Sequence, residues 1–235
     1  FFCLGWIAEK YPALIRRIVD NGHEVACHSM YHQLVYTHSR SSFAEDVRKS
    51  KIVLEDAGGS KIDTFRAPGF SITDQCLWAF EELMSAGYEV DCSIFPASRA
   101  HGGLREVCDG SPVVLRTKAG QSLFCLPMNV AKLGNLPFCY SGGGYFRLLP
   151  LGVIDYLMKR DPYVMTYFHP RDFDVEQPRV PGLSPFRRFK SYVGISGCEN
   201  KLRFLLDTYQ FNTVGDARSL IEWESVDTVS ISDAF

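Results

Sequence analysis

The sequence has no cysteine pair at metal-binding spacing, no long apolar run and no excess of either charge. Its eight cysteines are scattered and none forms a C-x-x-C pair, which argues against a cysteine zinc site. No apolar run approaches the roughly 20 residues that span a bilayer. The formal net charge is −2, which gives no support for binding nucleic acid or an anionic membrane. These absences argue against a cysteine-held zinc fold, a membrane-spanning protein and a nucleic-acid-binding protein.

The chain also has no recognisable signal peptide and does not begin with methionine. Its first residues, F-F-C-L-G-W, read as the end of a strand already in progress, so we expect that the sequence begins inside a longer protein. Several cysteines lie inside apolar runs, as Cys125 does in S-L-F-C-L-P, and the simplest interpretation is that they are small buried thiols. Such thiols favour a reducing compartment, and we therefore expect a cytoplasmic protein.

What the chain does have is an alternation of strand and helix patterns in 235 residues, 46% of them hydrophobic. We expect helices over residues 11–22, 41–59, 73–87, 151–161, 200–210 and 216–223. We expect strands over residues 23–27, 61–68, 88–95, 112–117, 122–127, 163–170 and 211–214. Repeated strand-helix units predict an α/β fold with a parallel sheet, open or closed into a barrel. Because no repeat or low-complexity linker interrupts them, we predict a single domain over residues 1–235.

Local signals set the ends of some elements and leave three long loops. Ser42 and Glu45 form the pattern of a capping box for the second expected helix, and Gly58 is expected to end it. The loops span residues 96–112, 128–150 and 170–195. Loops longer than about 12–15 residues in a compact domain are usually functional or disordered, so we expect functional residues in or beside them.

Polar side chains follow or end four of the expected strands: His28, His32, Arg66, Asp91 and His169. The carboxyl ends of parallel strands meet on one rim of a sheet, so we expect these side chains to converge. His28 and His32 are four residues apart, a spacing that shares one helical face, and imidazole suits divalent transition metals. The alternatives are structural histidines, a purely structural ion pair between Arg66 and Asp91, and a His169 that only caps a strand end.

The runs H-S-M-Y-H, R-A-P-G-F, D-C-S-I-F and Y-F-H-P, in this order, resemble the polysaccharide deacetylase family (the NodB-homology, carbohydrate esterase 4 type). The runs G-G-G-Y-F-R-L-L-P and F-H-P-R-D-F-D-V-E-Q-P-R resemble its subgroup encoded with bacterial exopolysaccharide-export systems. The resemblance covers about residues 1–215. It implies a distorted (β/α) barrel, which agrees with the alternation of strands and helices. The first strand of that barrel is expected to be absent from this chain.

The resemblance also implies an activity, a cofactor and a role for each polar residue. The activity is hydrolysis of N-acetyl groups on the amino sugars of an N-acetylated polysaccharide or oligosaccharide. It uses a divalent metal, commonly Zn²⁺, for which His28 and His32 match the histidine ligands. His169 matches the histidine that protonates the leaving amine, and Arg66 matches the arginine that positions an aspartate base. Asp91 matches the acidic partner of either the arginine or the acid histidine.

The chemistry is physically reasonable because an amide is a poor electrophile and an amine is a poor leaving group. A metal held by neutral imidazoles can acidify water and stabilise the tetrahedral oxyanion, and a histidine can protonate the departing nitrogen. Asp91 would fix the tautomer of a neighbouring histidine or raise its pKa. Ser29 is expected to bond the backbone of its turn rather than to attack substrate.

Three further residues are assigned to substrate binding: Tyr145, Phe146 and Pro68. The run S-G-G-G-Y-F-R-L-L-P is expected to be a mobile loop that faces the substrate, with the two aromatic rings offering flat faces to a sugar. The alternative is an ordinary flexible loop.

The aspartates of the family's first motif are not found in this sequence, and we expect the catalytic base and the third metal ligand upstream of Phe1. Glu45 and Asp46 belong to a helix start and are not expected to replace them. We therefore predict weak metal binding and little turnover by this chain. Two other functions remain open, a carbohydrate-binding remnant without catalysis and a metal-independent, allantoinase-like amidohydrolase. The H-S-x-x-H run counts against the second of these.

Overall fold

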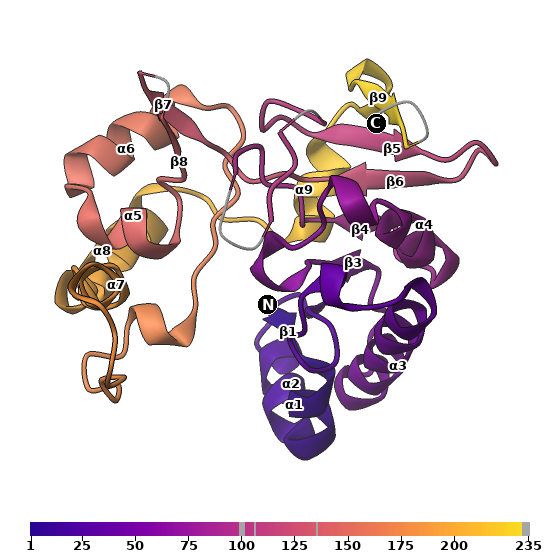
Figure 1. Cartoon of the computed structure of the whole chain (residues 1–235), viewed down its shortest axis with the longest axis horizontal. Helices are drawn as coiled ribbons and strands as arrows, with labels where there is room; N and C mark the ends of the chain where they lie inside the picture. The colour runs from indigo at the N-terminus through magenta and orange to yellow at the C-terminus, as the bar shows by residue number, and fades with distance from the viewer. Residues whose placement is uncertain (99–101, 106, 135, 232–235) are drawn as a thin grey trace. The chain divides into compact units, whose positions relative to one another are not determined.

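The computed structural model describes residues 1–98, 102–105, 107–134 and 136–231, and the chain divides into two compact units. The first unit consists of Phe1–Pro127 and Asn212–Phe235, and the second of Met128–Phe211 (Figure 1). The sequence predicted one domain over residues 1–235. Each unit has its own hydrophobic core. None of the helices in the described part of the chain is both long and apolar enough to cross a membrane.

A seven-stranded sheet forms the centre of the first unit, in the order β1-β2-β3-β4-β6-β5-β9 (Figure 1). Its strands, in that order, are Phe2–Cys3, Ala26–Cys27, Thr64–Phe65, Val90–Asp91, Ser122–Cys125, Val113–Arg116 and Thr228–Ser230. Neighbouring strands are parallel except β5 and β6, which form an antiparallel hairpin where the sequence predicted strands over residues 112–117 and 122–127. The α/β prediction is therefore confirmed, with a mostly parallel sheet.

Helices connect the parallel strands of this sheet. They are α1 (Gly5–Lys10), α2 (Pro12–Asp20), α3 (Arg40–Gly58), α4 (Trp78–Ser85) and α9 (Val214–Leu220). Short 3-10 helices lie at Val35–Thr37 (η1), Pro68–Phe70 (η2), Asp74–Cys76 (η3) and Trp223–Ser225 (η5). The inner face of α3 is apolar and buried, with Phe43, Val47 and Leu54 turned to the core. Phe43 packs edge-on against Phe65 of β3, with ring centroids 6.0 Å apart, and so fixes α3 on the sheet.

The caps of α3 differ from those predicted. The side chain of Ser39, rather than Ser42, accepts the capping hydrogen bond, with Ser39 Oγ 3.2 Å from the Ser42 amide. A residue three positions earlier thus satisfies the unpaired N–H groups of the first turn. The helix ends at Gly58, and Gly59 adopts the left-handed conformation of the C-terminal cap with φ 68°.

The second unit combines a small hairpin with four helices. The hairpin is β7 (Ala131–Leu133) and β8 (Leu136–Phe138), and the helices are α5 (Gly143–Leu148), α6 (Leu151–Arg160), α7 (Pro185–Tyr192) and α8 (Ile195–Thr208). Its core consists of Ala131, Tyr140, Phe146, Ile154, Leu157, Met158, Cys198 and Leu205. The hairpin, α5 and α7 lie inside segments that the sequence predicted to be loops.

The predicted strand over residues 163–170 is wrong. The described backbone has there a single parallel bridge, between Gly142 and Tyr167, and the 3-10 helix η4 (Pro170–Asp172). Side chains from another part of the unit occupy its backbone groups: Met165 donates to Asn129 Oδ1 at 2.7 Å, and its carbonyl accepts from Ser141 Oγ at 2.7 Å. Because side chains already satisfy these backbone groups, this part of the apolar run does not need to pair with a neighbouring strand.

The predicted strand over residues 211–214 is also wrong. Thr213 caps α9 instead, and its Oγ1 accepts a hydrogen bond from the Asp216 amide at 3.0 Å. The strand that joins the sheet from this segment is β9, which the sequence did not predict. A threonine followed three residues later by an acidic residue is the pattern of a helix start.

Candidate functional site

His28 follows directly after β2, and Arg66 follows directly after the neighbouring strand β3. The His28 amide donates to the Cys3 carbonyl at 2.8 Å, and the Arg66 amide donates to the Cys27 carbonyl at 3.0 Å. Parallel pairing of β1, β2 and β3 therefore brings the two residues to the same edge of the sheet, as predicted. Nδ1 of His28 lies 2.6 Å from the Arg66 carbonyl oxygen.

A turn, and not a helical face, brings His28 and His32 together. Ser29 and His32 both have positive φ, 68° and 60°, which is uncommon for residues other than glycine. The two imidazole centroids are 5.0 Å apart, with the rings nearly perpendicular. The i, i+4 spacing was correctly identified as a pair, but its helical explanation is wrong. Strained backbone of this kind costs on the order of 1–3 kcal/mol per residue and is concentrated at functional sites.

Two side chains hold this turn in place. Ser29 Oγ accepts a hydrogen bond from the His32 amide at 3.0 Å, which confirms the backbone role predicted for Ser29. Asp46 Oδ2, from the inner face of α3, accepts one from the Met30 amide at 3.0 Å. Burial raises the pKa of Asp46, and the hydrogen bond from Met30 acts in the opposite direction. Asp46 thus supports the histidine turn through the backbone.

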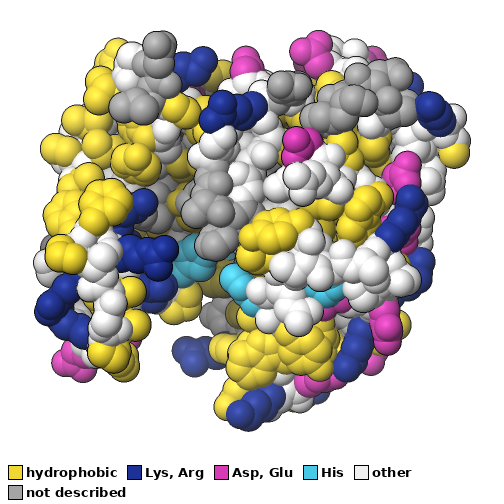
Figure 2. Space-filling model, in the orientation of Figure 1, with side chains coloured by type: hydrophobic (Ala, Val, Ile, Leu, Met, Phe, Trp, Pro, Cys, Tyr) yellow, Lys and Arg dark blue, Asp and Glu magenta, His cyan; other side chains and the backbone are white. Residues whose placement is uncertain are grey.

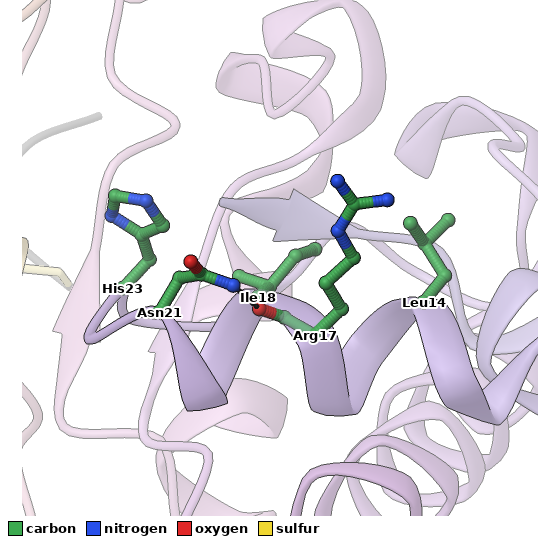
Figure 3. A pocket seen from close by; sticks show the side chains of 5 residues that line it. All are labelled: Leu14, Arg17, Ile18, Asn21 and His23. Atoms are coloured by element: carbon green, nitrogen blue, oxygen red, sulfur yellow. Dashed lines mark hydrogen bonds between the residues drawn. The ribbon is translucent and has the colours of Figure 1, made fainter.

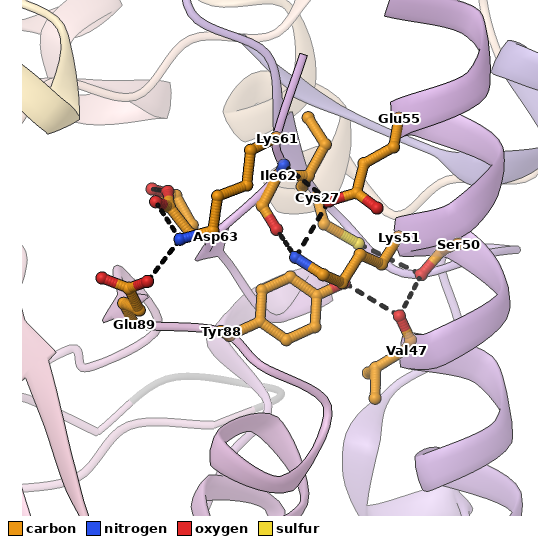
Figure 4. Close-up of polar contacts among 11 residues, drawn as sticks. Cys27, Val47, Ser50, Lys51, Glu55, Lys61, Ile62, Asp63, Tyr88 and Glu89 are labelled. Atoms are coloured by element: carbon orange, nitrogen blue, oxygen red, sulfur yellow. Dashed lines mark hydrogen bonds and ion pairs between the residues drawn. The ribbon is translucent and has the colours of Figure 1, made fainter. Parts of the chain in front are cut away.

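Beneath the turn, buried polar contacts fix the strand that carries it (Figure 4). Cys27, the last residue of β2, places its Sγ 3.1 Å from Ser50 Oγ on α3. The Tyr88 hydroxyl donates to the Val47 carbonyl of the same helix at 2.9 Å. Burial raises the pKa of the Cys27 thiol to about 11, so this thiol stays protonated and structural.

The chemistry of His28 fits a divalent metal. A carbonyl oxygen can only accept, so the Nδ1 that faces Arg66 carries the proton. The neutral ring then presents the lone pair of Nε2, which is the form that binds metals. His28 and His32 together fit as two ligands. Among the residues that the structure describes, no group of three or more histidines, cysteines, aspartates or glutamates could hold a metal ion.

The Arg66 side chain is buried at the end of β3. Its guanidinium carbon lies 3.9 Å from the centroid of the Phe2 ring, and its Nε donates to the Cys92 carbonyl at 3.2 Å. The stacked, hydrogen-bonded guanidinium is therefore fixed in one orientation.

Asp91 ends β4 and is fully buried. Its carboxylate accepts two hydrogen bonds from Ser93, from the amide at 2.8 Å and from Oγ at 2.6 Å. Burial raises the pKa of Asp91 to about 7, against the opposing effects of Ser93 and the positive charge of Arg66. The structure thus brings Arg66 and Asp91 to neighbouring strand ends, where the charge of one acts on the other.

Pro68 is buried in η2. This corrects its assignment to substrate binding, because a buried ring has no face for a sugar. The preceding residue, Ala67, donates its amide to Ser93 Oγ at 2.8 Å, so this segment belongs to the support of Asp91.

His169 belongs to the second unit, whereas His28, His32, Arg66 and Asp91 belong to the first. The side chain of His169 is 51% exposed. Its Nδ1 lies 3.5 Å from Asp172 Oδ2, and the same oxygen accepts a hydrogen bond from the His169 amide at 2.9 Å. Figure 2 shows histidine side chains reaching the surface of the molecule.

Asp172 and its partner Arg147 were not predicted from the sequence. Both side chains are buried, and Arg147 Nε lies 3.2 Å from Asp172 Oδ1. Burial raises the pKa of Asp172, but hydrogen bonds from His169 and the charge of Arg147 outweigh it and bring the pKa below its usual value. An acidic residue three positions after His169 was the available signal, because it can reach back to the start of a helical turn.

The two aromatic residues assigned to substrate binding have different surroundings. Phe146 is 0% exposed and packs edge-on against Phe168, with centroids 4.8 Å apart, so its assignment is wrong. Tyr145 is exposed and stays a prediction. The glycine run before them is not a loose loop, because a Cβ on Gly142 would lie 2.0 Å from the Tyr167 carbonyl oxygen. Close packing therefore requires glycine there.

A pocket beside α2 contains none of the predicted site residues. It is lined by Leu14, Arg17, Ile18, Asn21 and His23 (Figure 3). Asn21 Nδ2 donates to the Arg17 carbonyl at 2.7 Å, which satisfies the C-terminal end of α2. We therefore interpret the pocket as a consequence of the way in which α2 ends.

The parts of the chain before and after β4 match two different family models. Residues 1–89 match the polysaccharide deacetylase family. Residues 92–218, more than half of the chain, match a domain of unknown function, DUF3473.

Two Bacillus cereus proteins named peptidoglycan-N-acetylglucosamine deacetylase are similar to part of the chain. One is 29% identical over 93 residues, which are 39% of this chain and 34% of the relative. The other is 28% identical over 89 residues, which are 38% of this chain and 40% of the relative. The chain thus spans only about a third to two fifths of the length of the curated relatives it matches.

A solved structure from Mycobacterium smegmatis, assigned as a polysaccharide deacetylase, has the same fold. It aligns with a TM-score of 0.60 and 16% identity over 96% of this chain and 72% of that one. Residues 1–89 are thus similar to polysaccharide deacetylases, and the chain belongs to the family defined by the domain DUF3473.

Proposed function

We propose that this chain is a metal-dependent hydrolase that removes N-acetyl groups from amino sugars of a bacterial polysaccharide. The observation that carries the proposal is the strained turn that holds His28 and His32 together beside Arg66. The names of the Bacillus cereus relatives support an N-acetylated amino sugar as the substrate. We further propose a role in exopolysaccharide synthesis, which the resemblance of the G-G-G-Y-F and F-H-P-R-D runs supports.

His28 and His32 would hold the divalent metal, for which we propose Zn²⁺. When bound, such a metal supplies acidified water and polarises the acetyl carbonyl. The Arg66 carbonyl keeps His28 in the tautomer that presents Nε2, and Ser29 and Asp46 fix the turn. We expect the metal to bind weakly, since the described residues offer two ligands and no larger cluster.

His169 would hold the proton that the leaving amine needs. Its Nδ1 faces the Asp172 carboxylate, so Nε2 is the atom that would deliver the proton. Arg66 would position the base. The buried Asp91, which accepts hydrogen bonds from Ser93, would hold the end of β4 beside Arg66. Tyr145, exposed on α5, would offer its ring to the sugar.

A cytoplasmic location is part of the proposal. All eight cysteines are free, as a reducing compartment permits.

Zinc titration by calorimetry, with acetate release from N-acetylglucosamine oligomers, tests the proposed function. His28→Ala should abolish the zinc-dependent signal and acetate release. The matched control is His38→Ala, which removes from the same unit a histidine ring that lies near Ser42 and Phe43. Acetate release by His28→Ala at the wild-type rate would contradict the proposal.

A carbohydrate-binding protein without catalysis is the second candidate. The observation that favours it is that only two candidate ligands come together among the described residues. Oligosaccharide binding without acetate release at saturating zinc would support this candidate against the first.

A further inference from the structure

Helix α7 of the second unit is exposed along nearly its whole length. All residues from 184 to 190 are exposed, and no residue of α7 is buried. Phe186 and Phe189 are 70% and 53% exposed. Two large exposed aromatic rings on one short helix form an apolar surface patch, whereas a single exposed apolar residue would not.

The apolar and basic side chains of α7 lie on different sides of the helix. Phe186 and Phe189 are three residues apart and share a face, whereas Arg187 and Arg188 point about 100° and 200° away from Phe186. Lys190 lies beside the apolar face, with Nζ 5.3 Å from the Phe186 ring centroid. We call Phe186, Phe189 and Lys190 the α7 face, which Arg187 and Arg188 flank.

The chain segment that contains α7 carries charge of one sign. Between Gln177 and Cys198 the chain carries four basic residues and no acidic one: Arg179, Arg187, Arg188 and Lys190. Figure 2 shows Lys and Arg side chains beside hydrophobic ones in the region where Figure 1 places α7. The net charge of −2 for the whole chain conceals this local excess, so the overall charge balance did not indicate an anionic partner.

The C-terminal end of α7 is anchored. Arg147 donates from Nη1 to the Ser191 carbonyl at 2.7 Å and from Nη2 to the Lys190 carbonyl at 3.0 Å. The Tyr192 hydroxyl accepts from the Val180 amide at 2.8 Å. A helix of 8 residues is only marginally stable by itself, so these contacts stabilise α7. Its two exposed rings do not belong to the core of the second unit.

We propose that the α7 face docks this protein on an anionic lipid surface. Phe186 and Phe189 would enter the boundary between headgroups and acyl chains, and the arginines and the lysine would contact the anionic headgroups. A bilayer supplies both an apolar layer for the rings and the negative charge that the basic side chains need. This role goes beyond the proposed deacetylase function and does not depend on it.

Sedimentation of the full chain with vesicles tests the proposal. We expect binding to phosphatidylcholine vesicles that contain phosphatidylserine, little binding to phosphatidylcholine alone, and a decrease as salt rises. Exchanging both rings, Phe186→Ser with Phe189→Ser, should weaken binding by at least about tenfold. The matched control is Leu206→Ser, an exposed apolar residue of α8, which should leave binding unchanged. Equal binding by the ring variant and wild type would overturn the proposal.

A second measurement locates the ring itself. In Phe186→Trp the new indole should be quenched by brominated lipids in anionic vesicles, whereas in Tyr156→Trp, an exposed site on α6, it should not. The three native tryptophans belong to the first unit and provide the unquenched background: Trp6, Trp78 and Trp223. Absence of quenching at position 186, or binding to an anionic glycan or protein but not to vesicles, would refute lipid docking.

Discussion

Two histidines of this chain have ring nitrogens that face different kinds of acceptor. Nδ1 of His28 faces the neutral Arg66 carbonyl at 2.6 Å, and Nδ1 of His169 faces the Asp172 carboxylate at 3.5 Å. A carbonyl only selects the tautomer, which suits a neutral metal ligand. A carboxylate can also pair with the imidazolium once it forms, which suits a group that carries a proton. The surroundings therefore favour the two different roles proposed for these residues.

Asp172→Asn tests the carboxylate that faces His169. We expect kcat for deacetylation to fall at least about tenfold with KM little changed, because the tautomer is no longer selected. The ¹⁵N spectrum of His169 should change from one tautomer to a mixture. Asp172→Glu serves as the conservative control and should recover part of kcat. A variant that loses stability but keeps the wild-type tautomer and kcat would show that Asp172 is only structural.

The buried carboxyl of Asp91 should make stability depend on pH. Its pKa is raised from 3.8 in the unfolded chain to about 7 in the folded one, so the folded state binds the extra proton between these values. The free energy of unfolding should therefore fall as pH rises from about 4 to 7, by on the order of 3 kcal/mol from this group alone. Asp91→Asn should remove that part of the pH dependence in urea denaturation. An unchanged slope in the variant would contradict this assignment.

At the scale of elements, those that depend on local sequence patterns were predicted correctly, and those that depend on long-range contacts were not. The strands β5 and β6 and the helix α6 were correctly located, because the period of a strand or a helix is encoded within one short stretch. The apolar run 163–170 was wrongly predicted as a strand, because its backbone partners are side chains such as Asn129. Nothing within the run itself identifies such partners.

The glycines of the second unit allow a matched test of packing between elements. Gly142→Ala would place a Cβ 2.0 Å from the Tyr167 carbonyl oxygen, a backbone atom that cannot move aside. We expect a loss of about 1–3 kcal/mol in the free energy of unfolding. Gly152→Ala on α6 meets no atom within 4 Å and should instead stabilise by roughly 0.5–1 kcal/mol. Denaturation monitored by circular dichroism compares the two, and similar effects in both would argue against the close contact.

At the scale of the whole molecule, the strand-end residues of the first unit were predicted more successfully than the residues that support the site. His28, Arg66 and Asp91 each follow or end a strand, a position that the apolar pattern reveals directly. Asp172 and Arg147 were missed because their pairing joins residues 25 positions apart in segments predicted to be loops. The fold class was predictable from the alternation of elements, whereas the division into two units depends on which helices share a core.

The first unit is built from two distant segments of the chain, and its last part should contribute to stability. Trp223 of η5 packs on Phe124 of β6 with ring centroids 4.6 Å apart, and Arg218 of α9 lies over the same Phe124 ring. Arg218 Nη1 also lies 2.8 Å from Glu89 Oε2. Trp223→Ala should therefore destabilise the first unit by about 1–3 kcal/mol, since a partly buried aromatic contact is lost.

Fluorescence in a denaturant series measures this effect through the remaining tryptophans, Trp6 and Trp78, which both belong to the first unit. Leu220→Ala is the matched control, because Leu220 is an exposed residue of α9 and its truncation should change the transition little. A transition in Trp223→Ala that coincides with that of Leu220→Ala would mean that the C-terminal segment adds no stability to the sheet. A shift only in Trp223→Ala would show that residues 212–231 fold as part of the first unit, through the contact that Trp223 makes with β6.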